Sequence, residues 1–303
     1  MSSNPTPATD QPLMPDSLRP GGRFDTWRPA RPRYVVVDVD GTLVGEGTTA
    51  TPRVRDAVAG ASAAGLAIGF ATGRLPAGLT DLRAQLALSG PHLVHNGAEV
   101  LADGQRVAAW PLSPAEVKSV LEVLRRLDVY AEFYVGDGFL VTDYWEPARP
   151  HWELITGGPD GLITAADLDV VEVVRVCPVL VGDEGLERLI GELRALGLAV
   201  TPSSSPIIPG MHFVNTTDAA ADKGQALAVA ARHLGCSLAE VVAVGDGAND
   251  VAMLDVAGTA IAMGQAPREV LAAAHLVAPE VAADGVAHAL ESVTAWLAEP
   301  QRG

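Results

Sequence analysis

The stretch YVVVDVDGT, residues 34–42, decides the fold of this chain. Its first four residues are apolar without a polar interruption, which predicts a strand buried on both faces, as in a parallel sheet. Asp38 and Asp40 follow that strand at once. Because ligands of α/β proteins bind at the carboxyl edge of the parallel sheet, these two carboxylates are candidate functional residues.

The segments on either side of this stretch predict alternating strands and helices. Thr51-Pro52 is a natural N-cap and first-turn pair for a helix that Gly65 ends, and residues 66–73 form a second apolar strand. The same alternation returns late in the chain, so the fold class is α/β with a doubly wound, mostly parallel sheet. Further helices are expected at 75–88, 220–234, 249–256 and 267–274, and further strands at 92–95, 241–244 and 259–263.

The middle of the chain has a different pattern and predicts an inserted α+β domain. Ser113-Pro114-Ala115-Glu116 is a capping box that opens a helix, and Gly136-Asp137-Gly138 predicts a hairpin. A strand at 171–181, a helix at 185–197 and a strand at 198–201 follow. We therefore expect a core at 31–111 and 210–303, an inserted domain at 112–209, and a disordered tail at 1–30, which is rich in Pro, Ser, Thr and Gly.

Charge and composition limit the possible partners. The 303 residues carry a formal net charge of −16, which repels nucleic acid and anionic membranes, so neither is an expected partner. A small phosphorylated ligand is compatible with this charge, because a bound metal ion can reverse the sign of the field in a pocket.

The N-terminus lacks the pattern of a secretory signal, which indicates a cytoplasmic protein. Cys177 and Cys236, the two cysteines, cannot form a thiolate zinc site.

A second pair of carboxylates follows another apolar strand. Asp246 and Asp250 come after the VVAV run at 241–244. Together with Asp38 and Asp40 they would repel one another unless a cation lay among them, and Mg²⁺ prefers such oxygen ligands. The glycine at position 41 is too early for a calcium loop of the EF-hand type. Asp103 and Asp137, between strand-like halves, are expected in plain hairpin turns.

Two other segments could bind phosphate. Thr72, in Ala71-Thr72-Gly73-Arg74, ends the second apolar strand, where its hydroxyl and the backbone N–H groups after it can hold phosphate oxygens. Lys223 opens a predicted helix and can supply positive charge to a transferring phosphoryl group. The chain has no P-loop, dinucleotide-binding or nucleophile-elbow motif.

Taken in order, these motifs resemble those of the haloacid dehalogenase-like superfamily. The matching segments are DVDGT at 38–42, ATGR at 71–74, Lys223 in DKGQAL, and GDGAND at 245–250, and the likeness covers about residues 31–290. An insertion between the second and third motifs resembles the large αβ cap of the Cof-like, sugar-phosphatase branch (type IIB), which NGA at 96–98 and ADGVA at 283–287 also match. Gly247 replaces a common serine, and the approach to Lys223 is longer and more polar than usual.

The resemblance implies a role for each matching residue. Asp38 would be the nucleophile and Asp40 the general acid and base. Mg²⁺ would bind Asp38, the backbone carbonyl of Asp40 and Asp246, while Asp250 would orient metal-bound water or Lys223. The residues implied in phosphoryl binding are Thr72, Gly73, Arg74, Lys223 and Asn249.

The implied activity is Mg²⁺-dependent hydrolysis of a small phosphorylated metabolite, such as a sugar phosphate, through an aspartyl-phosphate. A phosphomutase would use the same residues, whereas a non-catalytic phospholigand-binding module predicts a broken motif, and none is broken. In the inserted domain, Tyr144, Trp145 and Trp152 could stack on a substrate, although packing in that domain's own core is the favoured interpretation. The sequence does not indicate an oligomeric state.

Overall fold

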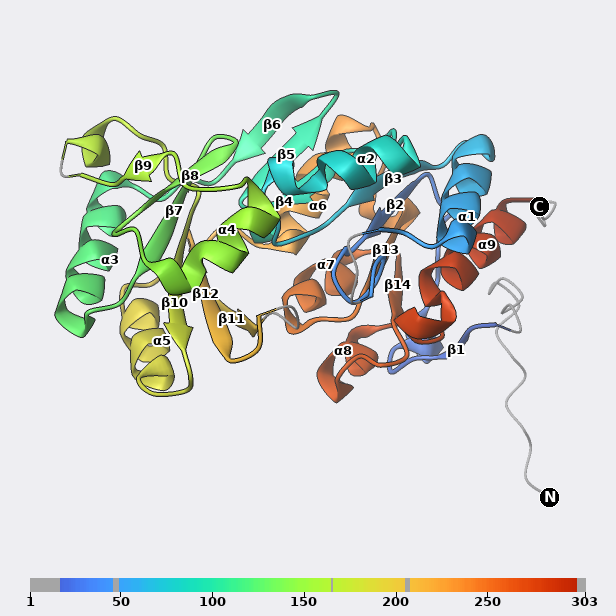
Figure 1. The fold of residues 1–303 in the computed structure, drawn as a ribbon. Coiled ribbons are helices and arrows are strands. Elements are labelled where there is room, and N and C mark those ends of the chain that lie inside the picture. The colour runs from blue at the N-terminus through green and yellow to red at the C-terminus, as the bar shows by residue number, and fades with distance from the viewer. Residues whose placement is uncertain (1–16, 46–48, 165, 205–207, 299–303) are drawn as a thin grey trace, which may run out of the picture.

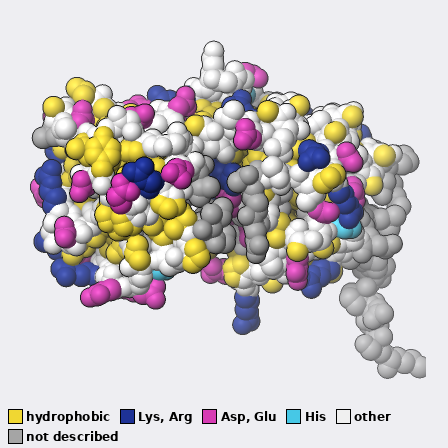
Figure 2. All heavy atoms as spheres, viewed as in Figure 1, with side chains coloured by type: hydrophobic (Ala, Val, Ile, Leu, Met, Phe, Trp, Pro, Cys, Tyr) yellow, Lys and Arg dark blue, Asp and Glu magenta, His cyan; other side chains and the backbone are white. Residues whose placement is uncertain are grey.

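The computed structural model describes residues 17–45, 49–164, 166–204 and 208–298. Figure 1 shows two bodies side by side, an α/β core formed from both ends of the chain and a cap formed from its middle. Figure 2 shows charged side chains of both signs scattered over this face, with apolar side chains gathered on the cap. Within the described ranges, no helix combines the length and the apolar character needed to cross a bilayer.

The core is built on a six-stranded sheet in the order β1-β15-β14-β13-β2-β3. From β15 to β3 the neighbours run parallel, and β1 adds an antiparallel edge. The strands are β1 Arg19–Pro20, β2 Tyr34–Val37, β3 Ala67–Phe70, β13 Val241–Gly245, β14 Thr259–Ala262 and β15 Leu276–Val277. Both outer pieces of the chain thus form one sheet, which confirms the predicted fold class.

The central strand β2 is buried on both faces, as its uninterrupted apolar run predicts. Val35 and Val37 pack into the hydrophobic cluster on one face of the sheet. Tyr34 and Val36 pack into the cluster on the other face. Because side chains alternate along a strand, four apolar residues in a row serve both clusters and fix β2 in the middle of the core.

Helices cover both faces of this sheet (Figure 1). Helices α1, α2 and α9 pack on one face, and α6, α7 and α8 on the other. Thr51 caps α1 by accepting a hydrogen bond from the backbone N–H of Val54 at 3.2 Å, as predicted. The helix bounds are α1 Pro52–Ala63, α2 Thr80–Leu86, α6 Lys223–His233, α7 Val251–Val256, α8 Arg268–Ala273 and α9 Gly285–Ala298.

A small antiparallel sheet joins the core to the cap. Its strands are β4 His92–Val94, β5 Glu99–Ala102 and β6 Gln105–Ala109, with the expected hairpin turn at Asp103. The strand expected at 92–95 is therefore present, but it belongs to this sheet and not to the central one. The short 3-10 helices are η1 Phe24–Thr26, η2 Pro76–Leu79, η3 His95–Gly97, η4 Glu146–Ala148, η5 Asp167–Asp169, η6 Leu238–Glu240, η7 Ala248–Asp250 and η8 Val281–Ala283.

The cap is a second six-stranded sheet, in the order β11-β12-β10-β7-β8-β9, and only its β8–β9 pair is parallel. Helices α3 and α5 pack on one face, and α4 lies on the other, toward the core (Figure 1). The bounds are α3 Pro114–Leu127, β7 Ala131–Val135, β8 Gly138–Val141, α4 Arg149–Ile155, β9 Gly161–Leu162, β10 Arg175–Val181, α5 Leu186–Ala195, β11 Ala199–Ser204 and β12 Met211–Thr217.

Two boundaries differ from those expected. Strand β12 pairs with β10 and β11, so the cap sheet continues through Thr217 and the expected boundary at residue 209 falls inside the cap. At the N-terminus, residues 1–16 of the expected tail lie outside the described residues, but residues 17–30 are ordered. β1 pairs with β15, and Leu18 and Trp27 are buried against the core. These apolar side chains stabilise a segment whose local composition indicates disorder.

Two buried histidines make core stability depend on pH. His92 Nδ1 accepts a hydrogen bond from Phe70 N at 3.2 Å, and His275 Nδ1 accepts one from Ala260 N at 2.9 Å. Burial, aided by a nearby arginine, lowers the pKa of each histidine to about 4. Between about pH 4 and pH 6.5, both histidines therefore stay neutral in the folded protein, whereas the same side chains in the unfolded chain bind a proton.

We expect the free energy of unfolding to fall as the pH decreases from about 6.5 to about 4, by roughly 1–3 kcal/mol per histidine, because the unfolded state binds more protons. Urea unfolding across this range should show a smaller pH dependence in His92→Gln and His275→Gln than in the native protein. His233→Gln, at a more exposed position, is the control. Equal pH dependence in all four proteins would contradict the prediction.

Candidate active site

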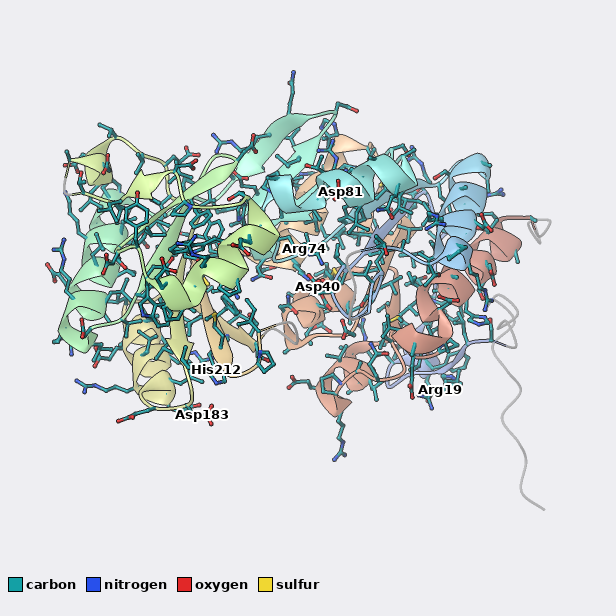
Figure 3. The ribbon with its side chains drawn as sticks, viewed as in Figure 1. Arg19, Asp40, Arg74, Asp81, Asp183 and His212 are labelled. Carbon is teal, nitrogen blue, oxygen red and sulfur yellow. The ribbon has the colours of Figure 1, made fainter. Side chains whose placement is uncertain are left out.

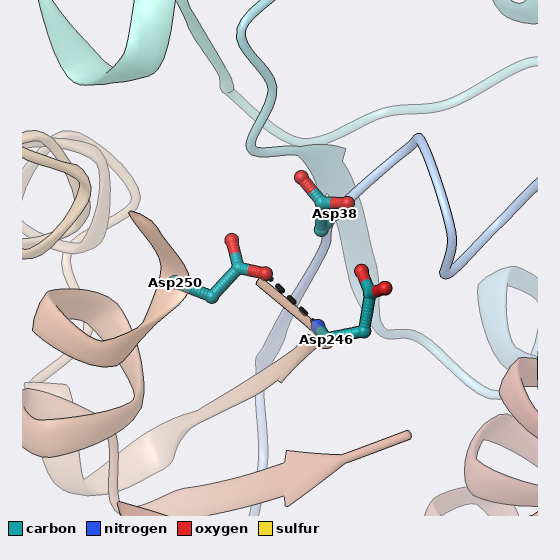
Figure 4. A group of neighbouring side chains, drawn as sticks. All are labelled: Asp38, Asp246 and Asp250. Carbon is teal, nitrogen blue, oxygen red and sulfur yellow. Dashed lines mark hydrogen bonds between the residues drawn. The ribbon is translucent and has the colours of Figure 1, made fainter. Parts of the chain in front are cut away.

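The ends of β2 and β13 bring acidic side chains from distant parts of the chain together. These strands are parallel neighbours, and Asp38 and Asp246 follow them directly. Asp250 lies one turn beyond, at the end of η7. One carboxylate oxygen from each of these three residues lies within 4.8 Å of the others, and Figure 4 shows the three side chains turned toward one another. Three of the four carboxylates predicted to cluster are thus together, whereas the carboxylate of Asp40 is not part of this group.

A buried lysine lies against this cluster. Lys223 Nζ donates hydrogen bonds to Asp38 Oδ1 at 2.7 Å and to Asp250 Oδ1 at 2.5 Å. The Asp222 side chain caps α6 by accepting hydrogen bonds from the backbone N–H groups of Gly224 and Gln225. The helix therefore begins at Lys223 and sets the position of that lysine. The polar approach from β12 thus ends in a helix N-terminus that directs the lysine into the site.

The charges of the site shift one another's ionisation. Burial lowers the pKa of a lysine, but the carboxylates of Asp250 and Asp38 outweigh it and hold the pKa of Lys223 above its usual value. Burial and the like charge of Asp250 raise the pKa of Asp38 well above its ordinary range. Burial also raises the pKa of Asp246. The cluster is therefore short of positive charge, as expected of a site that takes a cation.

Neutral hydrogen-bond donors contact both carboxylate oxygens of Asp246 and the Oδ2 atom of Asp250. Thr42 Oγ1 donates to Asp246 Oδ1 at 3.0 Å, and Gln265 Nε2 lies 3.4 Å from Asp246 Oδ2 and 2.6 Å from the Gly41 carbonyl. Asp250 Oδ2 accepts the backbone N–H of Asp246 and of Gly247, both at 2.9 Å. Gln265 was not predicted from the sequence, although its place just after β14 is a signal that could have indicated it.

This donor set fits a hard divalent cation. The ligands that the described cluster offers are all carboxylate oxygens, which Mg²⁺ prefers. Lys223 is bonded to Asp38 and Asp250, whereas Asp246 accepts only the neutral donors described above. Among the described residues, no cation is hydrogen-bonded to Asp246, so its negative charge is available to a metal ion.

Asp40 and Arg74 form a bidentate pair that the sequence did not predict. Arg74 Nε donates to Asp40 Oδ2 at 3.0 Å, and Arg74 Nη2 donates to Asp40 Oδ1 at 2.6 Å. Figure 3 shows the two side chains facing each other between core and cap. Arg74 was expected to bind substrate, but here its guanidinium is engaged by Asp40.

Thr72 and Gly73 lie in the loop between β3 and η2, with Thr72 buried. The Asn249 side chain donates to Asn96 Oδ1 at 3.1 Å, which ties the end of η7 to the turn after β4. A Cβ atom on Gly73 would lie 3.0 Å from Asn96 Oδ1, so this asparagine also borders the loop. The Asn96 N–H also donates to the Thr72 carbonyl at 2.9 Å, so Asn96 lies beside Thr72, Gly73 and Asn249, all predicted to bind phosphate.

The aromatic residues of the cap divide into two groups. Trp152 is buried and donates to the Tyr130 hydroxyl at 2.9 Å, and the ring of Trp145 lies 5.2 Å from that of Tyr130. Both tryptophans therefore pack within the cap, as the favoured interpretation predicts. Tyr144 is 57% exposed and makes no such contribution to the cap core.

Comparisons with known proteins agree with this architecture. The model of the haloacid dehalogenase-like hydrolase family matches residues 35–290. The chain is 28% identical over 272 residues to the HMP-PP phosphatase of Cronobacter sakazakii, covering 88% of this chain and 97% of the relative. It is 25% identical over 288 residues to the 5-amino-6-(5-phospho-D-ribitylamino)uracil phosphatase YwtE of Bacillus subtilis, covering 86% of this chain and 98% of the relative.

A solved structure shares this fold over most of the chain. The subclass IIB sugar phosphatase BT4131 superposes with a TM-score of 0.73 at 23% identity, over 86% of this chain and 98% of that one. At 23% identity, this likeness shows a shared fold, an α/β core with an inserted cap, and nothing more.

Gly41 provides a test of the cation site. Its φ is +85°, and a Cβ atom would lie 2.4 Å from Asp246 Oδ2, so Gly41→Ala must displace that carboxylate. We expect MgCl₂ to raise the thermal midpoint of the native protein, and we expect Gly41→Ala to lose that rise. Gly104→Ala is the matched control, because Gly104 has a φ of +74° and nothing within 4 Å of the added atom.

Both substitutions should cost about 1 kcal/mol of stability through backbone strain. Thermal unfolding with and without MgCl₂ separates this shared cost from the loss of metal binding. A Gly41→Ala protein that Mg²⁺ stabilises as much as it stabilises Gly104→Ala would contradict the assignment of Asp246.

Proposed function

Since the chain belongs to the haloacid dehalogenase-like hydrolases, we propose that it is a Mg²⁺-dependent phosphatase, which hydrolyses a small phosphorylated metabolite such as a sugar phosphate through an aspartyl-phosphate. The observation that carries the proposal is the buried Asp38 carboxylate, which lies against Lys223 and faces Asp246. The relatives named above as phosphatases support the reaction class.

Asp38 is the proposed nucleophile. Its Oδ1 accepts the hydrogen bond from Lys223, and within the described part of the chain its Oδ2 accepts none. This second oxygen attacks phosphorus as the bond from phosphorus to the ester oxygen breaks, which leaves the phosphoryl group on Asp38. Lys223 supplies positive charge beside the group that is transferred.

Asp40 is the proposed general acid and base. It donates a proton to the leaving alcohol oxygen, and then takes one from the water that displaces the Asp38 carboxylate from phosphorus. Its side chain is 60% exposed, so it lies where water can reach it. Arg74, bonded to both of its oxygens, sets the direction in which the Asp40 carboxylate points.

The other assignments follow the same geometry. Thr72, the Gly73 N–H, Lys223 and Asn249 are proposed to hold the phosphoryl oxygens. Asp38, the backbone carbonyl of Asp40 and Asp246 would hold Mg²⁺, with Asp250 orienting Lys223 without touching the ion. When bound, Mg²⁺ neutralises negative charge on the phosphoryl oxygens.

A panel of phosphate esters with and without EDTA tests the reaction. We expect Mg²⁺-dependent phosphate release, which Asp38→Asn lowers by at least about 10³-fold because the nucleophile is lost. Asp56→Asn, an exposed position on α1, is the control and should keep native activity. Release that EDTA does not affect, or that survives in Asp38→Asn, would refute the proposal, and isomerised sugar phosphate in place of free phosphate would identify a mutase.

Asp40→Asn tests the acid and base role separately. Nitrophenolate leaves without a proton, so p-nitrophenyl phosphate should still phosphorylate Asp38 in this variant, while hydrolysis of the aspartyl-phosphate slows. Rapid mixing should show a burst of nitrophenol that approaches one equivalent per enzyme, with little release from alkyl phosphates. An unchanged steady-state rate with alkyl phosphates would assign the proton transfers to another group.

A further inference from the structure

Arg175 joins the cap to the loop that bears Thr72 and Gly73. It is the first residue of β10, and only 5% of it is exposed. Its Nη1 donates to the Gly73 carbonyl and, at 3.0 Å, to Asn215 Oδ1. Its guanidinium lies over the ring of Tyr134, 3.8 Å from the ring centroid. A cap side chain is therefore in direct contact with the backbone of the candidate phosphate-binding loop.

The charge of Arg175 lacks an anionic partner. Among the residues that the structure describes, no carboxylate forms an ion pair with it, and its buried Nε has no hydrogen-bond partner. His95, close by, adds no charge, because burial and then the positive charge of Arg175 lower the pKa of His95 well below its ordinary value. A buried cation is costly without a nearby anion, so a negatively charged ligand would complete this arrangement.

A chain of hydrogen bonds leads from Arg175 to the Thr72 hydroxyl. The carbonyl that Arg175 bonds belongs to the peptide between Gly73 and Arg74, and the N–H of that same peptide donates to Thr72 Oγ1 at 3.1 Å. Hydrogen bonds in such a chain polarise one another, so a cation at the carbonyl end strengthens the donors further along. The Thr72 hydroxyl proton donates to no acceptor in the described part of the chain.

The neighbouring peptide offers a second donor. In the peptide between Thr72 and Gly73, the Thr72 carbonyl accepts a hydrogen bond from Asn96 N at 2.9 Å. This bond fixes the plane of the peptide and therefore the direction of the Gly73 N–H on its opposite side. In the described ranges the Gly73 N–H makes no hydrogen bond. The loop thus holds two donors without acceptors, the Thr72 hydroxyl and the Gly73 N–H, and Arg175 fixes the peptide between Gly73 and Arg74.

We propose that Arg175 is a positioning residue for phosphoryl binding, which strengthens the contacts of Thr72 and Gly73 with a phosphate dianion although it belongs to the cap. The inference rests on the proposed function. It makes phosphate affinity depend on the cap, since the contact exists only where β10 reaches Gly73. A phosphoryl group bound by the loop also supplies the negative charge that Arg175 lacks.

Titration calorimetry with inorganic phosphate in the presence of MgCl₂ tests this role on the full chain. We expect Arg175→Met to weaken phosphate binding about tenfold or more, the loss typical of a hydrogen bond from a charged group. Arg175→Lys keeps the charge and should restore part of the affinity. Arg126→Met is the control, because Arg126 is an exposed cap residue paired with Glu192, and it should bind phosphate as the native protein does.

Thermal unfolding separates this role from a merely structural one. Arg175→Met removes the cost of a buried cation but also loses two hydrogen bonds, so we expect the thermal midpoint of the unliganded variant to change little while its phosphate affinity falls. Native phosphate affinity in Arg175→Met would overturn the inference, as would the absence of phosphate binding by the native chain. A loss of affinity accompanied by an equal loss of stability in both Arg175 variants would also overturn it.

Ester hydrolysis measured in parallel separates this inference from the proposed function. If the native protein hydrolyses phosphate esters and Arg175→Met does so with unchanged KM, the function stands and the inference fails. If the native protein binds phosphate through Arg175 but hydrolyses no ester, the function fails and the anion site stands. A rise in KM that follows the loss of phosphate affinity supports both.

Discussion

Repulsion among three carboxylates governs the arrangement of this site. Asp38, Asp246 and Asp250 offer oxygens within 4.8 Å of one another, and such a cluster is stable only if cations lie beside it. Lys223 provides the first, because α6 begins at the same edge of the sheet and directs the ammonium between Asp38 and Asp250. The charge that remains uncompensated suits a divalent ion, so the protein's own electrostatics support the chemistry proposed for it.

The cap has its own, mostly antiparallel sheet and its own core, and it also packs against the α/β core. One apolar cluster contains Leu75 and Ala98 of the core together with Phe213 of the cap, so the two parts share buried surface. Polar contacts cross the same boundary, above all the one between Arg175 and the Gly73 carbonyl. In the proposed mechanism, this arrangement lets the cap influence how the loop binds phosphate.

Local patterns predicted those elements whose stability is local or whose apolar run is unambiguous. The uninterrupted strand β2, the cap at Thr51 and the hairpin turns at Asp103 and Asp137 are present as expected. The two wrong domain boundaries share one cause, since β12 and residues 17–30 are ordered by distant partners. β12 joins the cap sheet through β10 and β11, and β1 depends on β15 for its hydrogen bonds.

The sequence by itself determined which chemical groups this protein has and which strands they follow, because a carboxylate directly after a buried strand must emerge at the sheet edge. Only the tertiary structure decided which of them meet. Asp38 and Lys223 are 185 residues apart, and Gly73 and Arg175 are 102 apart. Asp40 takes Arg74 as its partner. The physical reason is that such pairings depend on strand order and on where the cap rests, and both are set by long-range packing.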